Sequence, residues 1–232
     1  MISAPLRSYF QLAKARVPRM AGFAALAIPS LMWSEFLTMG TLRHGYNLLT
    51  GAASDLATRG TPNALIFSAG FFFLPGLLTV LVAAGLWIAH RERRTWRIGA
   101  VLVGLAGVFL VLTGMFPQDP TSPLSGALHG AVSQTCFAIA AASMVSLAAG
   151  APREAHAKPP RRLWMASAGS VVLIEAFNVL LRAPLGVPNG LFQRPFTLAL
   201  TAWFVVTGIW LLRSHRLPGL SPRVNLTGQV PG

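Results

Sequence analysis

The sequence contains few charged residues and very few acidic ones. Only 11% of its 232 residues are charged, and Asp and Glu together number 6. A soluble domain of this size carries about a quarter charged residues. Because 53% of the residues are apolar, this composition excludes an ordinary soluble domain and favours an integral membrane protein.

The sequence also lacks the residues of several common functional sites. The single cysteine, Cys136, excludes an intrachain disulfide and a cysteine-rich metal centre. No His-Glu-x-x-His, Gly-x-Ser-x-Gly, phosphate-binding loop or dinucleotide-binding glycine motif is present. Asp55, Asp119 and His129 are metal-binding residue types, but their spacing is not diagnostic, so we assign no metal site. The sequence identifies no cofactor.

Long apolar runs, in contrast, are abundant. A helix needs roughly 20 mostly apolar residues to cross a bilayer, and only a helix satisfies its backbone polar groups internally there. We therefore predict an all-α membrane protein, a bundle of about six transmembrane helices. The predicted spans are Met20–Met39, Ala64–His90, Ile98–Phe116, Pro123–Ala149, Leu163–Leu181 and Phe196–Leu212.

The first of these spans could be mistaken for a secretory signal peptide, because basic residues precede it. It lacks a clear small-residue cleavage site, and Glu35 interrupts its end. We interpret it as a retained anchor.

The basic residues indicate how the bundle is oriented. If both termini are cytoplasmic, fifteen of the 19 Lys and Arg residues lie on the cytoplasmic side and four on the other. This asymmetry follows the positive-inside rule and supports an even number of spans. The net charge of +13 is therefore a topology signal, with contacts to anionic membrane lipids, and we expect no nucleic-acid partner.

The chain divides into three parts by composition. Residues 1–19 are predicted to form a basic interfacial segment, residues 20–212 the six-helix transmembrane domain, and residues 213–232 a flexible cytoplasmic tail. Within the domain, Pro75 is expected to kink the second helix. Glycines in the third helix should let neighbouring helices approach closely: Gly99, Gly104, Gly107 and Gly114.

The most informative residues are polar groups within the apolar spans. A carboxylate near the bilayer centre costs about 2.5–3.5 kcal/mol on insertion scales, so such residues are functional candidates. At about 1.5 Å rise per residue, Glu35 and Glu175 fall in the non-cytoplasmic half of the membrane. On the fifth helix, Glu175, Asn178 and Arg182 share one face, and on the fourth helix His129 shares a face with Ser133 and Cys136.

Each candidate also has a structural interpretation. Glu35 could simply reach the non-cytoplasmic interface, and Glu175 could pair with Arg182 or Arg194 for packing alone. Asp55 could cap a helix, and Asp119, which precedes a proline, could form an Asx turn. The sequence leaves these alternatives open.

Two short elements resemble a known family. Ser54-Asp55-Leu56-Ala57 precedes the second span; Gly114-Met115-Phe116-Pro117-Gln118-Asp119 follows the third, and His129 opens the fourth. This pattern resembles the prokaryotic membrane family catalogued as domain of unknown function 998, over about residues 20–212, with Ala57 in place of an expected glycine. The resemblance marks Ser54, Asp55, Pro117, Asp119 and His129. It implies a prokaryotic cytoplasmic membrane but no particular reaction.

We consider three functions. The first is a lipid or small-molecule site at the non-cytoplasmic end of the bundle, with acid/base hydrolysis or group transfer on a lipid or isoprenoid as its enzymatic version. The second is a non-catalytic membrane subunit or assembly scaffold within a homo- or hetero-oligomer, and the third is a proton-coupled transporter. For the first function, the predicted catalytic residues are Asp55, Asp119, His129 and Glu175, and the predicted ligand-binding residues are Ser54, Glu35, Asn178, Arg182 and Arg194.

Overall fold

The structure, a computed structural model, describes residues 4–90, 92–151 and 160–214, without the side chains of residues 4–15 and 181–183. Every element in these ranges is helical. The elements are α1 (Ala4–Leu42), η1 (Ala53–Ala57), α2 (Ala64–Ser68), η2 (Ala69–Phe73), α3 (Leu74–Ala89), α4 (Arg94–Met115), α5 (Pro123–Gly150), α6 (Arg161–Leu185) and α7 (Asn189–Ser214).

Six helical segments are long and apolar enough to cross a membrane, and each contains most of one predicted span. The predicted fold class, an all-α polytopic membrane protein, is therefore confirmed. The first segment extends from Arg16 to Leu42 and the last from Asn189 to Ser214.

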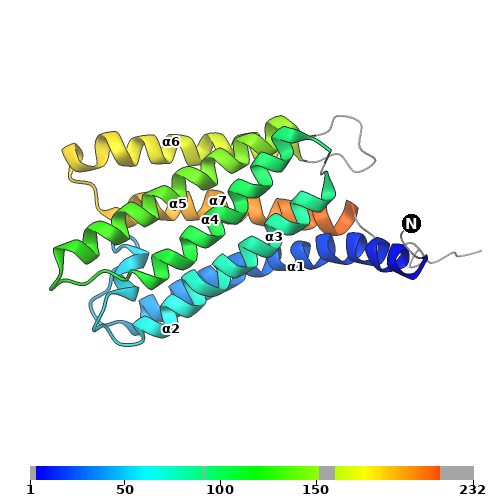
Figure 1. Cartoon of the computed structure of the whole chain (residues 1–232). Coiled ribbons are helices and arrows are strands. Elements are labelled where there is room, and N and C mark those ends of the chain that lie inside the picture. Colours follow the sequence, from blue (N-terminus) through cyan, green and yellow to red (C-terminus); the bar gives the residue numbers. More distant parts are fainter. Residues whose placement is uncertain (1–3, 91, 152–159, 215–232) are drawn as a thin grey trace, which may run out of the picture.

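The six spans form a closed ring. Each packs against the next along the chain, and α7 packs back against α1. The N-terminal end of α1 and the C-terminal end of α7 lie at the same end of the bundle (Figure 1). We call the opposite end, with the connectors 43–63, 116–122 and 186–188, the cavity end. That the cavity end is non-cytoplasmic remains a prediction from the basic residues.

The second span is interrupted close to Pro75. Its first turns, α2, pass into one π-helical turn, η2, before α3 begins at Leu74. A proline lacks the N–H that would continue the α-helical hydrogen bonds, and a single π-helical turn is one local adjustment by which a membrane helix tolerates it. The small residues expected on the third span do allow a close approach, because a Cβ atom on Gly107 would lie 2.7 Å from the Gly76 carbonyl oxygen.

The last span begins earlier than predicted. The sequence pattern placed its start at Phe196, but α7 begins at Asn189 and includes Pro195. Pro195 lies beyond the first turn of α7 and removes one of its backbone hydrogen bonds. Contacts with the connector 43–63 hold the first turn of α7 in place, since Gly190 N–H donates to the Thr50 carbonyl at 3.1 Å.

The terminal segments are only partly described. Residues 4–19, predicted as an interfacial segment, form the first turns of the continuous helix α1. Their position on a membrane surface stays a prediction. Most of the predicted tail, residues 215–232, lies outside the described residues.

The end opposite the cavity end is closed by aromatic packing, and we call it the tryptophan end. Trp96 is fully buried and donates from Nε1 to the Leu86 carbonyl at 2.5 Å. Its ring centroid lies 5.6 Å from those of both Trp164 and Trp210. Trp203 extends this cluster toward the middle of the bundle, with its centroid 6.3 Å from that of Trp164. These contacts bury large aromatic area and seal the ring.

Candidate functional site

Two adjoining cavities lie within the helix ring, toward the cavity end. One is lined mainly by apolar side chains, and we call it the apolar chamber. The other, the polar cavity, is lined mainly by amide, hydroxyl and ionisable side chains. Six residues line both of them: Ser54, His129, Ser133, Phe137, Gln193 and Phe196. The shared wall makes the pair one amphipathic space.

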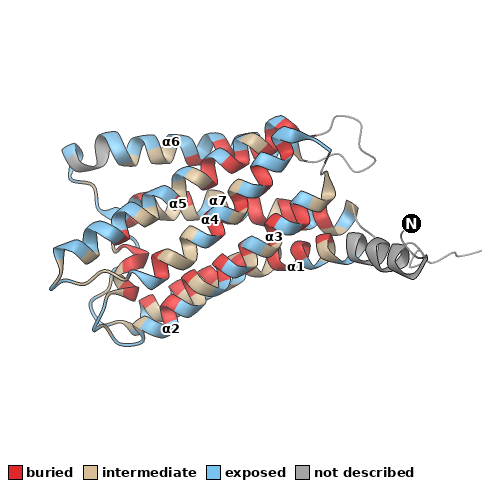
Figure 2. Ribbon diagram, in the orientation of Figure 1, coloured by how far each residue is buried: buried red, intermediate tan, exposed pale blue. Residues whose placement is uncertain are grey.

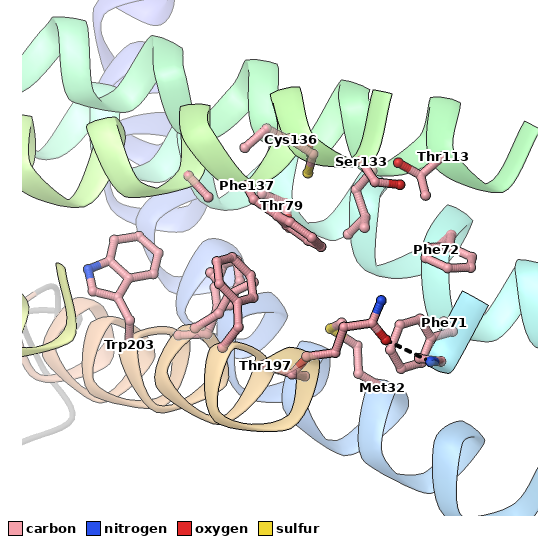
Figure 3. Close-up of a pocket in the computed structure, with 18 of the residues that line it drawn as sticks. Met32, Phe71, Phe72, Thr79, Thr113, Ser133, Cys136, Phe137, Thr197 and Trp203 are labelled. Atoms are coloured by element: carbon pink, nitrogen blue, oxygen red, sulfur yellow. Dashed lines mark hydrogen bonds between the residues drawn. The ribbon is translucent and has the colours of Figure 1, made fainter. Parts of the chain in front are cut away.

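The apolar chamber runs along the helices. On α5 its lining follows a single face from His129 to Met144, and on α7 it extends from Gln193 to Phe204. Its free volume is about 80 Å³. Trp203 lies at one end of this chamber, and Phe71 at the other, near the cavity end (Figure 3). The chamber is therefore an elongated apolar slot that ends at the tryptophan cluster.

The polar cavity has a free volume of about 170 Å³ and lies where α5, α6 and α7 meet. Its ionisable side chains among the described residues are His129 and Glu175. Amide side chains make up much of the remainder: Gln118, Gln134, Asn178, Asn189 and Gln193.

Helix α6 is the most loosely packed wall of this cavity. In its most apolar window only 17% of the residues are buried, against 39–44% in the other five spans. Figure 2 shows the same contrast, with α6 largely exposed toward the cavity end. In Figure 1, α5 and α6 lie together near the tryptophan end and diverge toward the cavity end. The side chains between the diverging ends are those of the polar cavity.

His129 is the predicted site residue that lies deepest in this arrangement. It is 4% exposed, and its Nδ1 lies 2.8 Å from the Phe116 carbonyl oxygen. A carbonyl oxygen only accepts hydrogen bonds, so Nδ1 carries the proton and donates it. In the neutral ring Nε2 then carries the lone pair and can accept a proton or a hydrogen bond. One turn further on, Ser133 lines the same wall, and its buried Oγ has no hydrogen-bond partner among the described residues.

The short helix η1 closes the cavity end of the chamber. Ser54, 6% exposed, accepts a hydrogen bond from Gln118 Nε2 at 3.3 Å. The neighbouring N–H of Ala53 donates to Gln193 Oε1 at 2.7 Å. These two bonds connect η1 to the connector 116–122 and to α7. The predicted residue Ser54 therefore lies beside His129 in the shared wall.

Asp55 and Asp119 do not line these cavities. The Asp55 carboxylate accepts from the N–H of Ala52 at 2.9 Å, which caps η1. Asp119 Oδ1 accepts from the N–H and the hydroxyl of Thr121 at 2.9 and 2.6 Å, as in an Asx turn, and Oδ2 lies 3.4 Å from Arg59. The hydrogen bonds from Thr121 lower the pKa of the Asp119 carboxyl. The structure thus separates both aspartates from His129, with which we expected them to form one mouth.

Arg194 lies between α7 and the connector 43–63. Its guanidinium donates to the carbonyl oxygens of Leu48 and Gly51, at 3.1 and 2.5 Å, and to the Tyr46 hydroxyl at 3.2 Å. The ring of Phe36 lies 4.0 Å from its Cζ. Burial raises the pKa of the Tyr46 hydroxyl, although Arg194 acts in the opposite direction. Arg194 holds the connector against the bundle and does not line the cavities.

The remaining predicted residues occupy different places. Glu175 and Asn178 both line the polar cavity from α6. Glu35 instead packs between α1 and η2, where a Cβ atom on Gly70 would lie 2.6 Å from its Oε1. The Glu35 Oε2 is buried without a hydrogen-bond partner among the described residues. The side chain of Arg182 lies outside the described residues.

Most of the amide residues around the polar cavity were not predicted from the sequence. Gln134 is exposed on α5 and follows Ser133 directly, and Asn189 opens α7. A helical face containing His129 and Ser133 was visible in the sequence, but Gln193 was assigned to a connector because the start of α7 was placed too late. Among the described residues no group of three or more His, Cys, Asp or Glu side chains could hold a metal ion.

These features define a class of protein, an integral multi-pass membrane protein with an amphipathic cavity inside a ring of six helices. The chain belongs to the family described as protein of unknown function (DUF998), whose family model matches residues 24–210. The resemblance inferred from the Ser-Asp and Phe-Pro-x-Asp elements is therefore confirmed. No curated protein and no solved structure matches the chain.

Proposed function

We propose that this protein binds a membrane amphiphile within the helix ring. The polar head would occupy the polar cavity beside His129, Ser133 and Glu175, and the hydrocarbon part would occupy the apolar chamber. One observation carries the proposal: the polar and apolar cavities share a wall of six residues. An amphiphile buries each part of its surface in a matching environment, which an entirely apolar or entirely polar cavity cannot offer.

The loosely packed α6 supports this proposal. Several of its large apolar side chains are exposed, among them Leu173 at 71% and Val179 at 68%. A bilayer component can therefore reach the polar cavity between α5 and α6 without crossing water. On the topology predicted from the basic residues, the ligand enters from the non-cytoplasmic leaflet of the cytoplasmic membrane.

Filling the chamber tests the proposal. Ala140 is buried and lines the apolar chamber, whereas Ala138 on the same helix is exposed. We expect Ala140→Phe to lose a lipid that wild-type protein retains from a lipid extract of the expression host, because the new ring occupies the chamber. The matched variant Ala138→Phe should retain it. Lipids are extracted from protein purified in nanodiscs formed with a synthetic phospholipid, and mass spectrometry quantifies them.

Equal retention by Ala140→Phe and Ala138→Phe would contradict the proposal. No retained lipid in wild-type protein would also contradict it. Either result would favour the alternative in which the polar side chains only hold helices together in a non-catalytic subunit.

We propose acid/base chemistry as the enzymatic version of this function, on the evidence of the His129 tautomer. With Nδ1 donating to Phe116, Nε2 would take a proton from a water molecule as the water oxygen bonds to an ester carbonyl carbon. The proton then passes to the leaving alcohol oxygen as the ester C–O bond breaks. Wild-type protein incubated with monooleoylglycerol should release oleate, and His129→Gln should not. No oleate above a protein-free control would contradict this version while leaving the binding proposal intact.

A further inference from the structure

The shape and charge of the two cavities restrict which amphiphile can bind, and this inference rests on the proposed function. We infer that the ligand has a single slender hydrocarbon chain and a polar head without negative charge, and that Trp203 contacts the chain terminus. Three observations support this inference: the size of the chamber, the side chains of the polar cavity, and the residue that closes the chamber.

The chamber is too small for a bulky or two-chain hydrocarbon group. Its free volume of about 80 Å³ is below the roughly 150 Å³ of an engineered cavity that admits a benzene ring. Its lining nevertheless extends from Gln193 to Phe204 on α7, a rise of about 16 Å at 1.5 Å per residue. This small volume leaves no space for two chains side by side, and even a single chain enters only as lining side chains move aside. Two acyl chains or a fused-ring lipid would have to displace packed aromatic side chains.

The described side chains of the polar cavity offer hydrogen bonds but little compensation for an anion. Its described side chains include one carboxylate, Glu175, and five amides, and none is Lys or Arg. Arg194, which lies nearby on α7, already donates to the carbonyls of the connector 43–63. A phosphate placed beside Glu175 would find no Lys or Arg among the described side chains of this cavity, and an ionised Glu175 would repel it. Amides instead donate and accept hydrogen bonds with hydroxyl or amide head groups.

Trp203 closes the chamber toward the tryptophan end. It is 1% exposed, its ring contacts Phe204 and Trp164, and it lies in Figure 3 at the opposite end from Phe71. Met144 on α5 lines the same deep region and is also buried. A rigid aromatic wall at a fixed depth limits the length of chain that fits above it. Trp203 is therefore assigned as the residue that sets the preferred chain length.

Competition binding in nanodiscs distinguishes the head and chain requirements. Radiolabelled monooleoylglycerol is bound first, and unlabelled competitors are then added. One competitor is oleoyl lysophosphatidic acid, which has one chain and an anionic head, and another is dioleoylglycerol, which has two chains and a neutral head. Geranylgeraniol serves as a neutral single-chain isoprenoid. We expect monooleoylglycerol or geranylgeraniol to bind at least about tenfold more tightly than both other probes, a factor that corresponds to about 1.4 kcal/mol. Whichever of these two probes binds more tightly shows whether the hydrocarbon chain of the ligand is an acyl or an isoprenoid chain.

Two sets of variants test the residues. Glu175→Lys should reverse the head-group preference in favour of lysophosphatidic acid. Glu92 is an exposed residue at the tryptophan end, and Glu92→Lys should leave this preference unchanged. Trp203→Leu should shift the optimum within a lauroyl, palmitoyl and stearoyl monoacylglycerol series toward longer chains. Met144→Ala enlarges the same region and provides a second test if Trp203→Leu does not fold. An unchanged chain-length optimum in folded variants would overturn the role of Trp203.

The outcomes separate this inference from the proposed function. If lysophosphatidic acid or dioleoylglycerol binds as tightly as monooleoylglycerol, and Ala140→Phe abolishes that binding, the cavity binds amphiphiles but the inferred ligand class is wrong. If Ala140→Phe leaves the binding of every probe unchanged, the cavity is not the site and both proposals fail.

Discussion

The two ends of the bundle differ in how side chains fill the space inside the helix ring. At the tryptophan end, four of the 6 tryptophans of the chain fill the ring and contact one another. At the cavity end, amide and hydroxyl side chains line a space that the helices leave open, and a folded connector covers it. Close aromatic packing stabilises the helix ring but leaves no space for a ligand. The polar walls at the cavity end are less closely packed, and the space between them can hold a ligand.

If this comparison is correct, the largest loss of stability follows damage to the tryptophan end. Trp96→Ala should lower the free energy of unfolding by about 3–5 kcal/mol, the usual range for removing a buried Trp. It also removes the hydrogen bond to the Leu86 carbonyl. Trp87, which is 40% exposed and has Arg97 Cζ 5.9 Å from its ring centroid, provides the control, and Trp87→Ala should cost only about 1 kcal/mol or less. Thermal unfolding in detergent checks both, and similar losses for the two variants would contradict the comparison.

At the cavity end, the largest effect should come from the connector. Arg194→Lys keeps the charge but loses the geometry that reaches Leu48, Gly51 and Tyr46 together. We expect a loss of about 1.5–3 kcal/mol, the range for hydrogen bonds to charged groups. Limited proteolysis should cut the connector 43–63 faster in this variant. Arg59→Lys, at an arginine whose side chain is 71% exposed, should leave the cleavage rate unchanged, and equal rates for the two variants would argue against the connector being held by Arg194.

A smaller effect is expected from Asp55. Because its carboxylate caps η1 through the N–H of Ala52, Asp55→Ala should cost about 1 kcal/mol, as for other helix caps. Asp55→Asn preserves a side-chain acceptor and should cost less. Thermal unfolding and lipid retention are measured together. Loss of lipid at wild-type stability would instead support a direct role of Asp55 in the site, as the sequence suggested.

The smallest effect concerns Asp119, which lies in a connector away from the cavities. Since hydrogen bonds from Thr121 lower the pKa of its carboxyl, Thr121→Ala should raise that pKa toward its ordinary value. A lowered pKa stabilises the fold above the unfolded-state pKa, and this contribution disappears as the pH falls through the folded-state value. The variant should therefore differ from wild type in the acidic range.

The pKa of Asp119 can be measured by NMR with isotope-labelled aspartate. The chain has two aspartates, Asp55 and Asp119, so the spectrum stays simple. Ser122→Ala alters the same connector without removing a hydrogen bond to the carboxylate and serves as the control. An identical titration of Asp119 in wild type and Thr121→Ala would contradict the assigned cause.

Much of the fold was predictable because its signals are local. The six apolar runs corresponded to six spans, and the glycines of the third span marked the contact between Gly107 and Gly76. The start of α7 was not predictable in this way. Pro195 is a local boundary signal, and contacts from the connector 43–63 override it.

The candidate site was predictable only in part. The face of His129 and Ser133 on α5, and that of Glu175 and Asn178 on α6, followed from helical spacing, and the structure brings these faces to one cavity. The aspartates illustrate the limit. The sequence around a connector carboxylate does not show whether that carboxylate caps a turn or faces a ligand. Only the positions of the neighbouring residues in the folded structure distinguish these two roles.

The sequence by itself determined that the chain is a six-span helical membrane protein, because hydrocarbon requires every backbone polar group to be satisfied within a helix. It also determined the family, because the short elements that identify the family can be recognised without knowing which residues contact one another. Only the tertiary structure decided which polar residues share a space and which are used within their own loops. That outcome depends on how the six helices close into a ring, and packing between residues far apart in the chain sets that closure.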